Sequence, residues 1–399
     1  MVPEGWYSTK LGKVFKSRRE RGRVGLPTLS VTLNNGLVLR ESLERKTDTN
    51  LSPEEHLLVR KGDIAYNMMR MWQGASGLAQ FDALVSPAYV VLKPTNDIDP
   101  IFASFFFKSA RMIHLFWAYS YGLTKDRLRL YFPDFSLIPA LLPPIEEQRR
   151  IGRLLTKWDR AIEIVDMLIK NSDAQRRSLT QKLVAGKTRL PVFENREWHA
   201  FPFGKIATIS KKRHDPKNDR TSKKCVELEH LESGSGRLLG HCDAQGQDST
   251  KAVFEPHDVL FGKLRPYLKK FYLADFAGVC STEIWVFKAS PSICEPAYLA
   301  CLVQTDAFQK AANVSSGSKM PRADWQVLKE ATFHLPSKDE QRAIVDLTSR
   351  ADQLVHLHRA AREKLATAKT ALMQQILTGN RRVKIADTSV PLVGNQVMK

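Results

Sequence analysis

The chain contains an internal repeat, and this feature constrains its fold more than any other. Residues 142–189 and 335–382 align without a gap at an offset of 193 positions. Both segments share a Leu-Pro start, a Glu-Gln-Arg triplet and a late glycine. The regions before them repeat more faintly, since 63–70 (DIAYNMMR) matches 258–265 (DVLFGKLR). A fixed period indicates duplicated units, so we expect two copies of a variable block followed by a helix.

Both repeated segments are predicted to form long helices. Pro143 and Pro336 stand just before the start of each, where a missing amide proton costs little. Gly186 and Gly379 stand just past the end, as helix C-caps prefer. Segments of about 40 residues at 1.5 Å per residue would form rods of roughly 60 Å.

Apolar residues follow a 4-3 spacing along the first helix and a similar one along the second, which indicates a narrow seam. They are Ile151, Leu155, Trp158, Ile162, Val165, Ile169, Leu179 and Leu183 in the first helix and Ile344, Leu347, Ala351, Leu354, Ala361, Leu365, Ala368 and Leu372 in the second. In the first helix the same spacing also passes through the polar Ser172 and Arg176. Two rods with one apolar stripe each most simply pack on each other, so we expect an antiparallel coiled coil. Two independent core helices, each buried in its own domain, are the alternative.

The variable blocks are expected to be mixed α/β domains. The predicted elements are strands at 62–66, 88–92, 258–261 and 283–287 and helices at 101–111 and 296–309. The predicted fold class is therefore α+β, with two mixed α/β domains joined by two long helices. The expected boundaries are 1–141 and 190–335 for the domains, 142–189 and 336–382 for the helices, and 383–399 for a C-terminal tail.

The charge of the chain indicates a polyanionic partner. The net charge is +19, from 61 Lys and Arg against 42 Asp and Glu, and nucleic acid is the simplest such partner. A merely basic soluble protein is the alternative. No apolar run approaches the ~18 residues needed to cross a bilayer, and the N-terminus lacks a signal-peptide core. We therefore expect a cytoplasmic protein without membrane contact.

The five cysteines do not indicate a disulfide framework, because their number is odd and no CxxC pair is present. Cys225, His230, His241 and Cys242 are potential metal ligands close together in the sequence. Their spacing does not match that of a structural zinc site. We therefore expect no metal, with buried thiols and surface histidines instead.

Taken together, these residues resemble the specificity (S) subunits of type I restriction-modification systems. The resemblance rests on LPPIEEQRRIGRLL…LTQKLVAGKTR, repeated as LPSKDEQRAIVDL…LMQQILTGNRR, and covers the chain to about Arg382. The second helix departs from the family pattern at Pro336-Ser337-Lys338, and His358 interrupts its seam.

The resemblance implies DNA sequence recognition without catalysis in this chain. Each recognition domain would read one half of a split double-stranded target, and the paired helices would set the gap between the halves. Two methyltransferase (modification) subunits would dock on the helices and methylate adenines with S-adenosylmethionine. Restriction subunits that use ATP and Mg would join to translocate and cut DNA. This chain itself would hold no cofactor.

The absence of catalytic motifs agrees with a subunit whose partners carry out the catalytic steps. The chain has no GxxxxGK[ST] phosphate loop and no Asn/Asp-Pro-Pro-aromatic methyltransferase motif. No arrangement of carboxylates and lysines stands out as a nuclease centre. Two other functions remain as alternatives: the specificity part of a fused restriction-methylation enzyme, and a coiled-coil adaptor without DNA affinity.

Candidate DNA-binding residues occupy equivalent places in the two blocks. One pair of segments is 17–23 (SRRERGR) and 211–224, which both follow a Gly-Lys dipeptide. The segments 70–72 and 263–267 each combine a cation with an aromatic ring after a strand, and the late loops 122–127 and 315–322 put small residues beside cations. Arginine suits bidentate guanine contacts and lysine suits phosphate. Solvated loops, or core positions for the two aromatic residues, are the alternative interpretation.

The predicted DNA-binding residues are Arg18, Arg19, Arg21, Arg23, Arg70, Trp72, Lys125 and Arg127 in the first block, and Lys211, Lys212, Arg213, Lys217, Lys223, Lys224, Lys263, Arg265, Tyr267, Ser316, Lys319 and Arg322 in the second. No catalytic, cofactor-binding or metal-binding residue is predicted.

Overall fold

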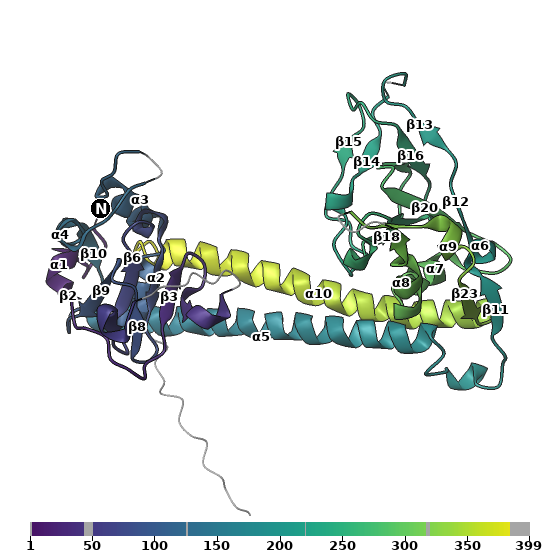
Figure 1. Ribbon diagram of the computed structural model, residues 1–399. Helices are drawn as coiled ribbons and strands as arrows, with labels where there is room; N and C mark the ends of the chain where they lie inside the picture. Colours follow the sequence, from purple (N-terminus) through teal and green to yellow (C-terminus); the bar gives the residue numbers. More distant parts are fainter. Residues whose placement is uncertain (1, 44–50, 125–126, 220, 317–319, 384–399) are drawn as a thin grey trace, which may run out of the picture. The chain divides into compact units, whose positions relative to one another are not determined.

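The computed structural model describes residues 2–43, 51–124, 127–219, 221–316 and 320–383. The chain forms two compact units: unit 1 comprises Met1–Asp166 and Ala361–Lys399, and unit 2 comprises Met167–Ala360. Helix α5 (Ile145–Val184) starts in unit 1 and ends in unit 2, whereas α10 (Lys338–Ile376) starts in unit 2 and ends in unit 1 (Figure 1). Each unit therefore contains one variable block and a portion of both long helices.

Unit 1 is built on an antiparallel four-stranded sheet with the order β2-β9-β6-β7. The pairs β1-β10, β3-β4 and β5-β8 accompany it. Phe15, Phe107 and Phe135 form its core together with Ile151 of α5 and Ile376 of α10. The strands are β1 (Tyr7–Lys10), β2 (Phe15–Arg18), β3 (Leu29–Thr32), β4 (Gly36–Leu39), β5 (Leu57–Val59), β6 (Ile64–Asn67), β7 (Ser76–Leu78), β8 (Ala83–Val85), β9 (Tyr89–Pro94) and β10 (Pro139–Leu142). The short helices are α1 (Leu11–Val14), α2 (Pro100–Phe106), α3 (Ala110–Ala118) and α4 (Phe132–Leu137).

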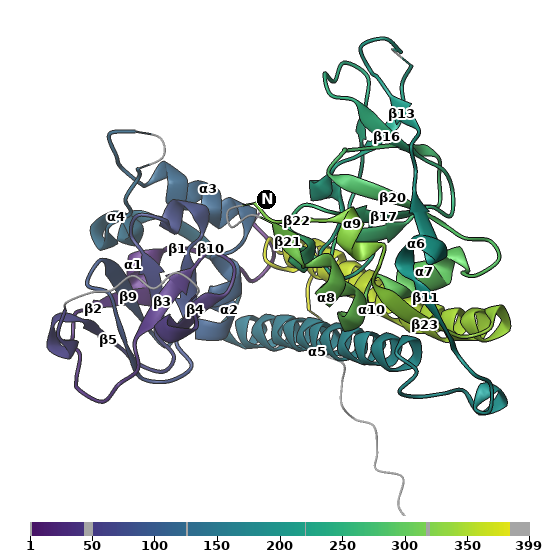
Figure 2. The ribbon, with the colours of Figure 1, turned by 45° about the vertical axis from the view of Figure 1, so that its right-hand side comes forward.

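Unit 2 repeats the four-stranded sheet with the order β12-β20-β17-β18. It also contains a five-stranded sheet, β13-β16-β19-β14-β15, in which β14 and β19 run parallel. Phe203, Phe287 and Phe308 lie in its core with Leu183 of α5 and Ile344 of α10. The strands are β11 (His199–Pro202), β12 (Ala207–Ile209), β13 (Arg213–His214), β14 (Lys224–Val226), β15 (Cys242–Asp243), β16 (Lys251–Phe254), β17 (Val259–Gly262), β18 (Phe271–Leu273), β19 (Gly278–Cys280), β20 (Ile284–Ala289), β21 (Ser315–Ser316), β22 (Arg322–Ala323) and β23 (Thr332–Leu335). The short helices are α6 (Phe203–Ile206), α7 (Pro296–Leu302), α8 (Asp306–Ala312) and α9 (Trp325–Leu328), and α7 contacts β17, β18 and β20 (Figure 2).

The mixed α/β character of both blocks is confirmed, but two predicted helices are wrong as single elements. The segment 101–111 contains all but the first residue of α2 and the start of α3, and 296–309 contains α7 and the start of α8. The reason is a cap in the middle of each segment. Ser109 and Thr305 accept hydrogen bonds from the amides of Met112 (3.4 Å) and Phe308 (3.3 Å), so a new helix starts there.

The ends of the long helices follow the proline and glycine signals. Helix α5 starts two residues after Pro143, and α10 starts two residues after Pro336. Gly186 and Gly379 have φ angles of +67° and +75°, the left-handed region that favours glycine at a C-cap. A Cβ atom on Gly186 would lie 3.4 Å from the Trp198 ring, so a side chain there would also crowd the tryptophan.

The Glu-Gln-Arg triplet at the start of each long helix anchors the helix to its own block. In unit 2, Gln341 Oε1 accepts from the Glu295 amide (2.8 Å), and Gln341 Nε2 donates to the carbonyls of Ile293 (2.8 Å) and Pro336 (3.0 Å). Gln148 makes the equivalent bonds in unit 1, to the backbone of Asp97, Asp99 and Pro143. Both glutamine side chains are fully buried, so the triplet has a structural role.

Within each unit the portions of α5 and α10 run antiparallel. In unit 1, Lys369 forms an ion pair with Asp159, and Arg362 Nε lies 3.1 Å from Asp166 Oδ1. In unit 2, Arg176 Nη1 lies 3.4 Å from Asp352 Oδ1, and Ser172 bonds His358 (3.2 Å). Residue numbers rise on α5 as they fall on α10, which is the antiparallel pattern. The seam of a continuous coiled coil stays a prediction.

Candidate nucleic-acid interface

Two of the predicted DNA-binding segments lie side by side in unit 2. Leu264 forms a β-bridge with Arg322, and the Arg265 amide donates to the Pro321 carbonyl (2.8 Å). Ser316 belongs to β21, which pairs with the β22 strand that contains Arg322. The segments 263–267 and 320–323, which are far apart in the sequence, therefore form one surface.

The turn at this surface has an unusual backbone conformation and exposes two of the predicted residues. Arg265 and Lys269 have φ angles of +51° and +50° and flank the short 3-10 turn Pro266–Leu268. Residues other than glycine rarely adopt this left-handed conformation. Arg265 is exposed and Tyr267 is 55% exposed, so the tyrosine is not a core residue. Arg322, in contrast, forms a bidentate ion pair with Glu283 at 3.0 and 3.1 Å.

Unit 1 brings the equivalent segments together. The Leu130 amide donates to the Met68 carbonyl (2.9 Å), which joins the loop after α3 to the end of β6. Arg70 and Arg127 are exposed, whereas Trp72 is half-buried and donates its Nε1–H to the Met69 carbonyl (3.0 Å). Lys125 and Lys319 lie outside the described residues.

In the first basic run, 17–23, one arginine forms ion pairs within the protein and three arginines are exposed. The Arg18 side chain is 10% exposed, its Nε lies 2.6 Å from Asp63 Oδ2, and it also pairs with Glu20. The hydrogen bond with Asp63 raises the pKa of Arg18 above its ordinary value. Exposed side chains follow at Arg19, Arg21 and Arg23. This part of the run is the one open to an outside partner.

Most cations of the second run contact groups of their own unit. Lys212 pairs with Glu255 (2.7 Å), Lys217 with Asp248 (3.6 Å) and Lys223 with Asp219 (2.8 Å). Arg213 donates to the carbonyls of Ser210 (3.0 Å) and Lys212 (3.1 Å), Lys224 lies over the Phe276 ring (4.9 Å), and Lys211 is exposed. Exposed ion pairs are weak in water, so phosphates could replace these carboxylates.

The repeated aspartates Asp63 and Asp258 support the central strands. Asp63 accepts from the Arg60 amide (3.0 Å) and Asp258 from the Glu255 amide (2.9 Å), and both are buried. Asp258 also pairs with Lys288 (2.9 Å), as Asp63 pairs with Arg18. These carboxylates shape the turn before β6 and β17 and belong to the scaffold.

Among the described residues no group of His, Cys, Asp and Glu side chains could hold a metal ion. His230 Nδ1 accepts from the Glu227 amide (3.0 Å), and the His241 ring lies by Phe276. Cys225 and Cys242 face each other across β14 and β15 as free thiols. Burial raises the pKa of the Cys225 thiol to about 12.

Several apolar side chains on the long helices face solvent. In unit 2, Met167 and Leu168 of α5 are 50% and 43% exposed, and Leu354 and Leu357 of α10 are 45% and 67% exposed. Leu354 had been assigned to the predicted seam, yet nearly half of its surface is open. Within the described part of the chain, no helix is both long enough and apolar enough to span a membrane.

The chain is similar to proteins of one known family. Residues 195–367 match the family model described as type I restriction modification DNA specificity domain. The chain is also 20% identical, over 96% of its length and 94% of the relative's, to the type I restriction enzyme MjaVIII specificity subunit of Methanocaldococcus jannaschii. The chain thus matches the family of type I restriction-modification specificity (S) subunits. A second S subunit, that of the Escherichia coli type I restriction enzyme EcoDI, is 28% identical over 40% of this chain and 38% of its own length.

Solved structures have the same fold as this S subunit. The HsdS subunit of Thermoanaerobacter tengcongensis superposes with a TM-score of 0.51 at 17% identity, covering 95% of this chain and 98% of its own. The S subunit of M. genitalium gives 0.53 at 15% identity, covering 94% and 98%. A chain from a study of complex assembly and conformational transition of the type I R-M system gives 0.60 at 17% identity, covering 96% and 100%.

These matches confirm the function that the resemblance implies. This S subunit has a DNA sequence-specificity role and is not itself an enzyme, because the catalytic activities of type I systems belong to partner subunits. The fused enzyme and the adaptor without DNA affinity are not favoured. Which residues contact DNA stays a prediction.

Proposed function

We propose that each unit reads one half of a bipartite double-stranded DNA target through two adjacent loops. In unit 2 these loops are 263–269 and 320–323, and in unit 1 they are 68–73 and 121–130. One observation carries the proposal: basic segments distant in the sequence lie side by side in both units, at equivalent positions of the repeat. Because the two loop pairs differ in sequence, the two half-sites should differ.

The predicted residues would divide between bases and phosphates. Arg265 and Arg70, exposed beside the adjoining loops, would reach base edges, since a guanidinium suits guanine. Arg19, Arg21, Arg23 and the lysines of 211–224 would contact phosphates. Arg322 would have to exchange Glu283 for DNA, and Arg18, whose side chain is 10% exposed, would have to exchange Asp63.

The long helices would hold the two recognition domains, 1–141 and 190–335, at a fixed separation. In this proposal the helix segments 142–189 and 336–382 pack as an antiparallel coiled coil along their whole length. Antiparallel ion pairs within each unit support it. The unread gap between the half-sites would follow from the length of the helix pair.

The exposed apolar residues of the helices would dock two methyltransferase subunits. Met167, Leu168, Leu354 and Leu357 are large apolar side chains open to solvent, and such groups commonly mark protein interfaces. S-adenosylmethionine would bind in the methyltransferase subunits, and ATP and Mg in restriction subunits that join the complex. The assembly would work in the cytoplasm.

The first test is a salt titration of DNA binding by the chain co-expressed with its methyltransferase subunit. Each phosphate contact contributes about 0.9 to the slope of log affinity against log salt. Replacing Lys211, Lys212 and Lys217 by Ala should therefore weaken binding to all sequences and lower the slope by up to about 3. Replacing the exposed Lys205 and Lys310, outside the predicted surface, is the control. Salt-independent binding by the unaltered complex would contradict the proposal.

The second test maps methylated adenines genome-wide in cells that express this complex. The expected result is a split motif with two unlike halves at one fixed gap. Substituting Arg265 by Ala should relax a base in one half only, and substituting Arg70 by Ala should relax a base in the other. Methylation without any sequence motif, or at one continuous motif without a gap, would count against recognition by two units.

A further inference from the structure

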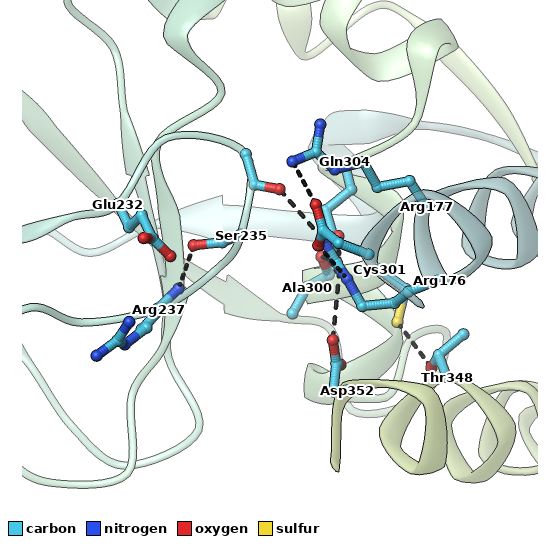
Figure 3. Close-up of polar contacts among 12 residues, drawn as sticks. Arg176, Arg177, Glu232, Ser235, Arg237, Ala300, Cys301, Gln304, Thr348 and Asp352 are labelled. Carbon is cyan, nitrogen blue, oxygen red and sulfur yellow. Dashed lines mark hydrogen bonds and ion pairs between the residues drawn. The ribbon is translucent and has the colours of Figure 1, made fainter. Parts of the chain in front are cut away.

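Arg176 is a buried arginine at which several elements of unit 2 meet (Figure 3). Its side chain projects from α5 and is 3% exposed. Nε and Nη2 both contact Asp173 Oδ1 at 3.2 Å, and Nη1 contacts Gln304 Oε1 at 3.1 Å and Asp352 Oδ1 of α10 at 3.4 Å. Nη2 also donates to the Gly234 carbonyl at 3.3 Å. Each of the three nitrogen atoms of the planar guanidinium therefore contacts at least one acceptor.

The loop 232–237 is held by both long helices. Arg176 of α5 holds it at Gly234, and Arg359 of α10 holds it at Glu232, with Arg359 Nη1 3.2 Å from Glu232 Oε2. Inside the loop, the Arg237 amide donates to Ser235 Oγ (3.2 Å) (Figure 3). The loop therefore has a fixed shape and two side-chain attachments to the helices.

The same loop contacts the turn that carries the predicted DNA-binding residues. The Gly234 amide donates to the Lys269 carbonyl (3.0 Å), and Ser233 forms a β-bridge with Lys270. A Cβ atom on Gly236 would lie 2.6 Å from the Phe271 ring, so the backbone packs directly on β18. Lys269 ends the turn that starts at Arg265. A contiguous series of contacts thus joins α5 to the turn 265–269.

We propose that Arg176 is a positioning residue that fixes the turn 265–269 through loop 232–237, and thereby sets how sharply unit 2 discriminates its half-site. This inference rests on the proposed function of that turn. A residue that only stabilised the fold would not need a buried guanidinium, because apolar side chains often replace buried ion pairs without loss of stability. A guanidinium holds several acceptors at fixed angles, which the point charge of lysine does not.

The repeat itself supplies a comparison. The position equivalent to Arg176 in unit 1 is Lys369, and its partner Asp159 is equivalent to Asp352. Lys369 keeps the ion pair and lies 5.2 Å from the Phe105 ring centre, but no contact of its ammonium with a loop equivalent to 232–237 occurs among the described residues. The effect of Arg176 should therefore be confined to the half-site read by unit 2.

The experiment compares the complex of the unaltered chain with Arg176→Lys and Arg177→Lys on DNAs in which each base of each half-site is varied. Arg177 is the matched control, since it is 60% exposed and pairs with the same Asp173 at 2.7 Å. The half-site of unit 2 is the one whose discrimination Arg265→Ala lowers. We expect Arg176→Lys to lower discrimination there about tenfold, with the other half-site and the salt slope unchanged. Arg177→Lys should match the unaltered chain.

Three outcomes would overturn the proposal or its basis. Unchanged discrimination in Arg176→Lys would overturn the positioning role, and an equal loss at both half-sites would reduce Arg176 to a structural group. Absence of bipartite binding by the unaltered complex would instead sink the proposed function. If Arg176→Lys does not assemble, Arg359→Gln decides, because this residue is more exposed (29%) and holds the same loop. Unchanged discrimination in Arg359→Gln would then overturn the proposal.

Discussion

Arg189 forms a bidentate ion pair with Glu340 in unit 2, with Nε–Oε1 and Nη2–Oε2 distances of 2.9 and 3.0 Å. Arg382 and Glu147, at the equivalent positions of the repeat, form the same pair in unit 1 with both distances at 2.7 Å. Each pair joins the start of one long helix to the segment that follows the other. The Glu340 side chain is 1% exposed and also accepts from Trp198 Nε1 at 3.2 Å.

The first prediction concerns the stability of this pair. Arg189→Met should destabilise unit 2 by about 3–5 kcal/mol, because it leaves the buried Glu340 carboxylate without its cation. Adding Glu340→Leu should recover much of the loss, since an apolar pair needs no counter-charge. Native-state hydrogen exchange measures the effect in unit 2 separately from unit 1. A single substitution without consequence would contradict the role assigned to the pair.

The second prediction separates backbone strain from recognition at Arg265. Glycine adopts the left-handed conformation at φ +51° without steric penalty. Arg265→Gly should therefore leave stability unchanged or raise it by up to about 1 kcal/mol, while weakening binding to the half-site of unit 2. Thermal unfolding and DNA titration measure the two effects. Arg265→Ala serves as the comparison, because it removes the guanidinium and keeps the strain. A fall in stability with unchanged DNA binding would refute this assignment.

The third prediction tests whether the helices set the gap. Four residues inserted in both helices where the units meet, after Asp166 in α5 and after Ala360 in α10, add about 6 Å and roughly one turn while leaving contacts within each unit intact. Duplex DNA rises about 3.4 Å per base pair, so the gap in the methylated motif should widen by one to two base pairs. The half-sites themselves should not change. An active complex that keeps the original gap would show that spacing is set elsewhere.

The fourth prediction is a pH dependence of unit 2. A hydrogen bond from Lys338 and a further one from Arg342 hold the pKa of Glu295 below its ordinary value of 4.5. A depressed folded pKa contributes stability above pH 4.5 that is lost as the pH falls through the folded value. Glu295→Gln should thus lower stability near neutral pH by up to about 1 kcal/mol, and the difference should vanish in acid. Urea denaturation at several pH values checks this, with the exposed Glu363→Gln as control. A difference independent of pH would argue against the ion pairs.

Much of the fold follows from the sequence because its signals are local or periodic. The repeat predicts two similar units, and the same four-strand order in both agrees with it. Prolines and glycines mark the ends of the long helices to within a few residues. The two split helices were missed because Ser109 and Thr305 are ordinary residues until their side chains cap the following turn.

The candidate surface was less predictable because its geometry depends on distant partners. Asp63 and Glu283 lie 45 and 39 residues from the arginines they hold, Arg18 and Arg322, and a run of charges does not indicate such pairing. Sequence also gives no sign that Pro321 would fix the backbone of Arg265. The signals that indicate these segments are their equivalent places in the two blocks and their cations beside aromatic or small residues.

The Glu-Gln-Arg triplet, whose glutamates and glutamines are buried, has a consequence for comparing related sequences. Among the described residues, its glutamates and glutamines contact groups of the scaffold, including Arg189, Arg382, Trp198 and the backbone before each short helix pair. A chain can therefore retain the triplet unchanged while every exposed loop residue is replaced. Two related chains that share the triplet can therefore be expected to recognise different target sequences. The differences between their target sequences would come from the exposed turns, such as 265–269.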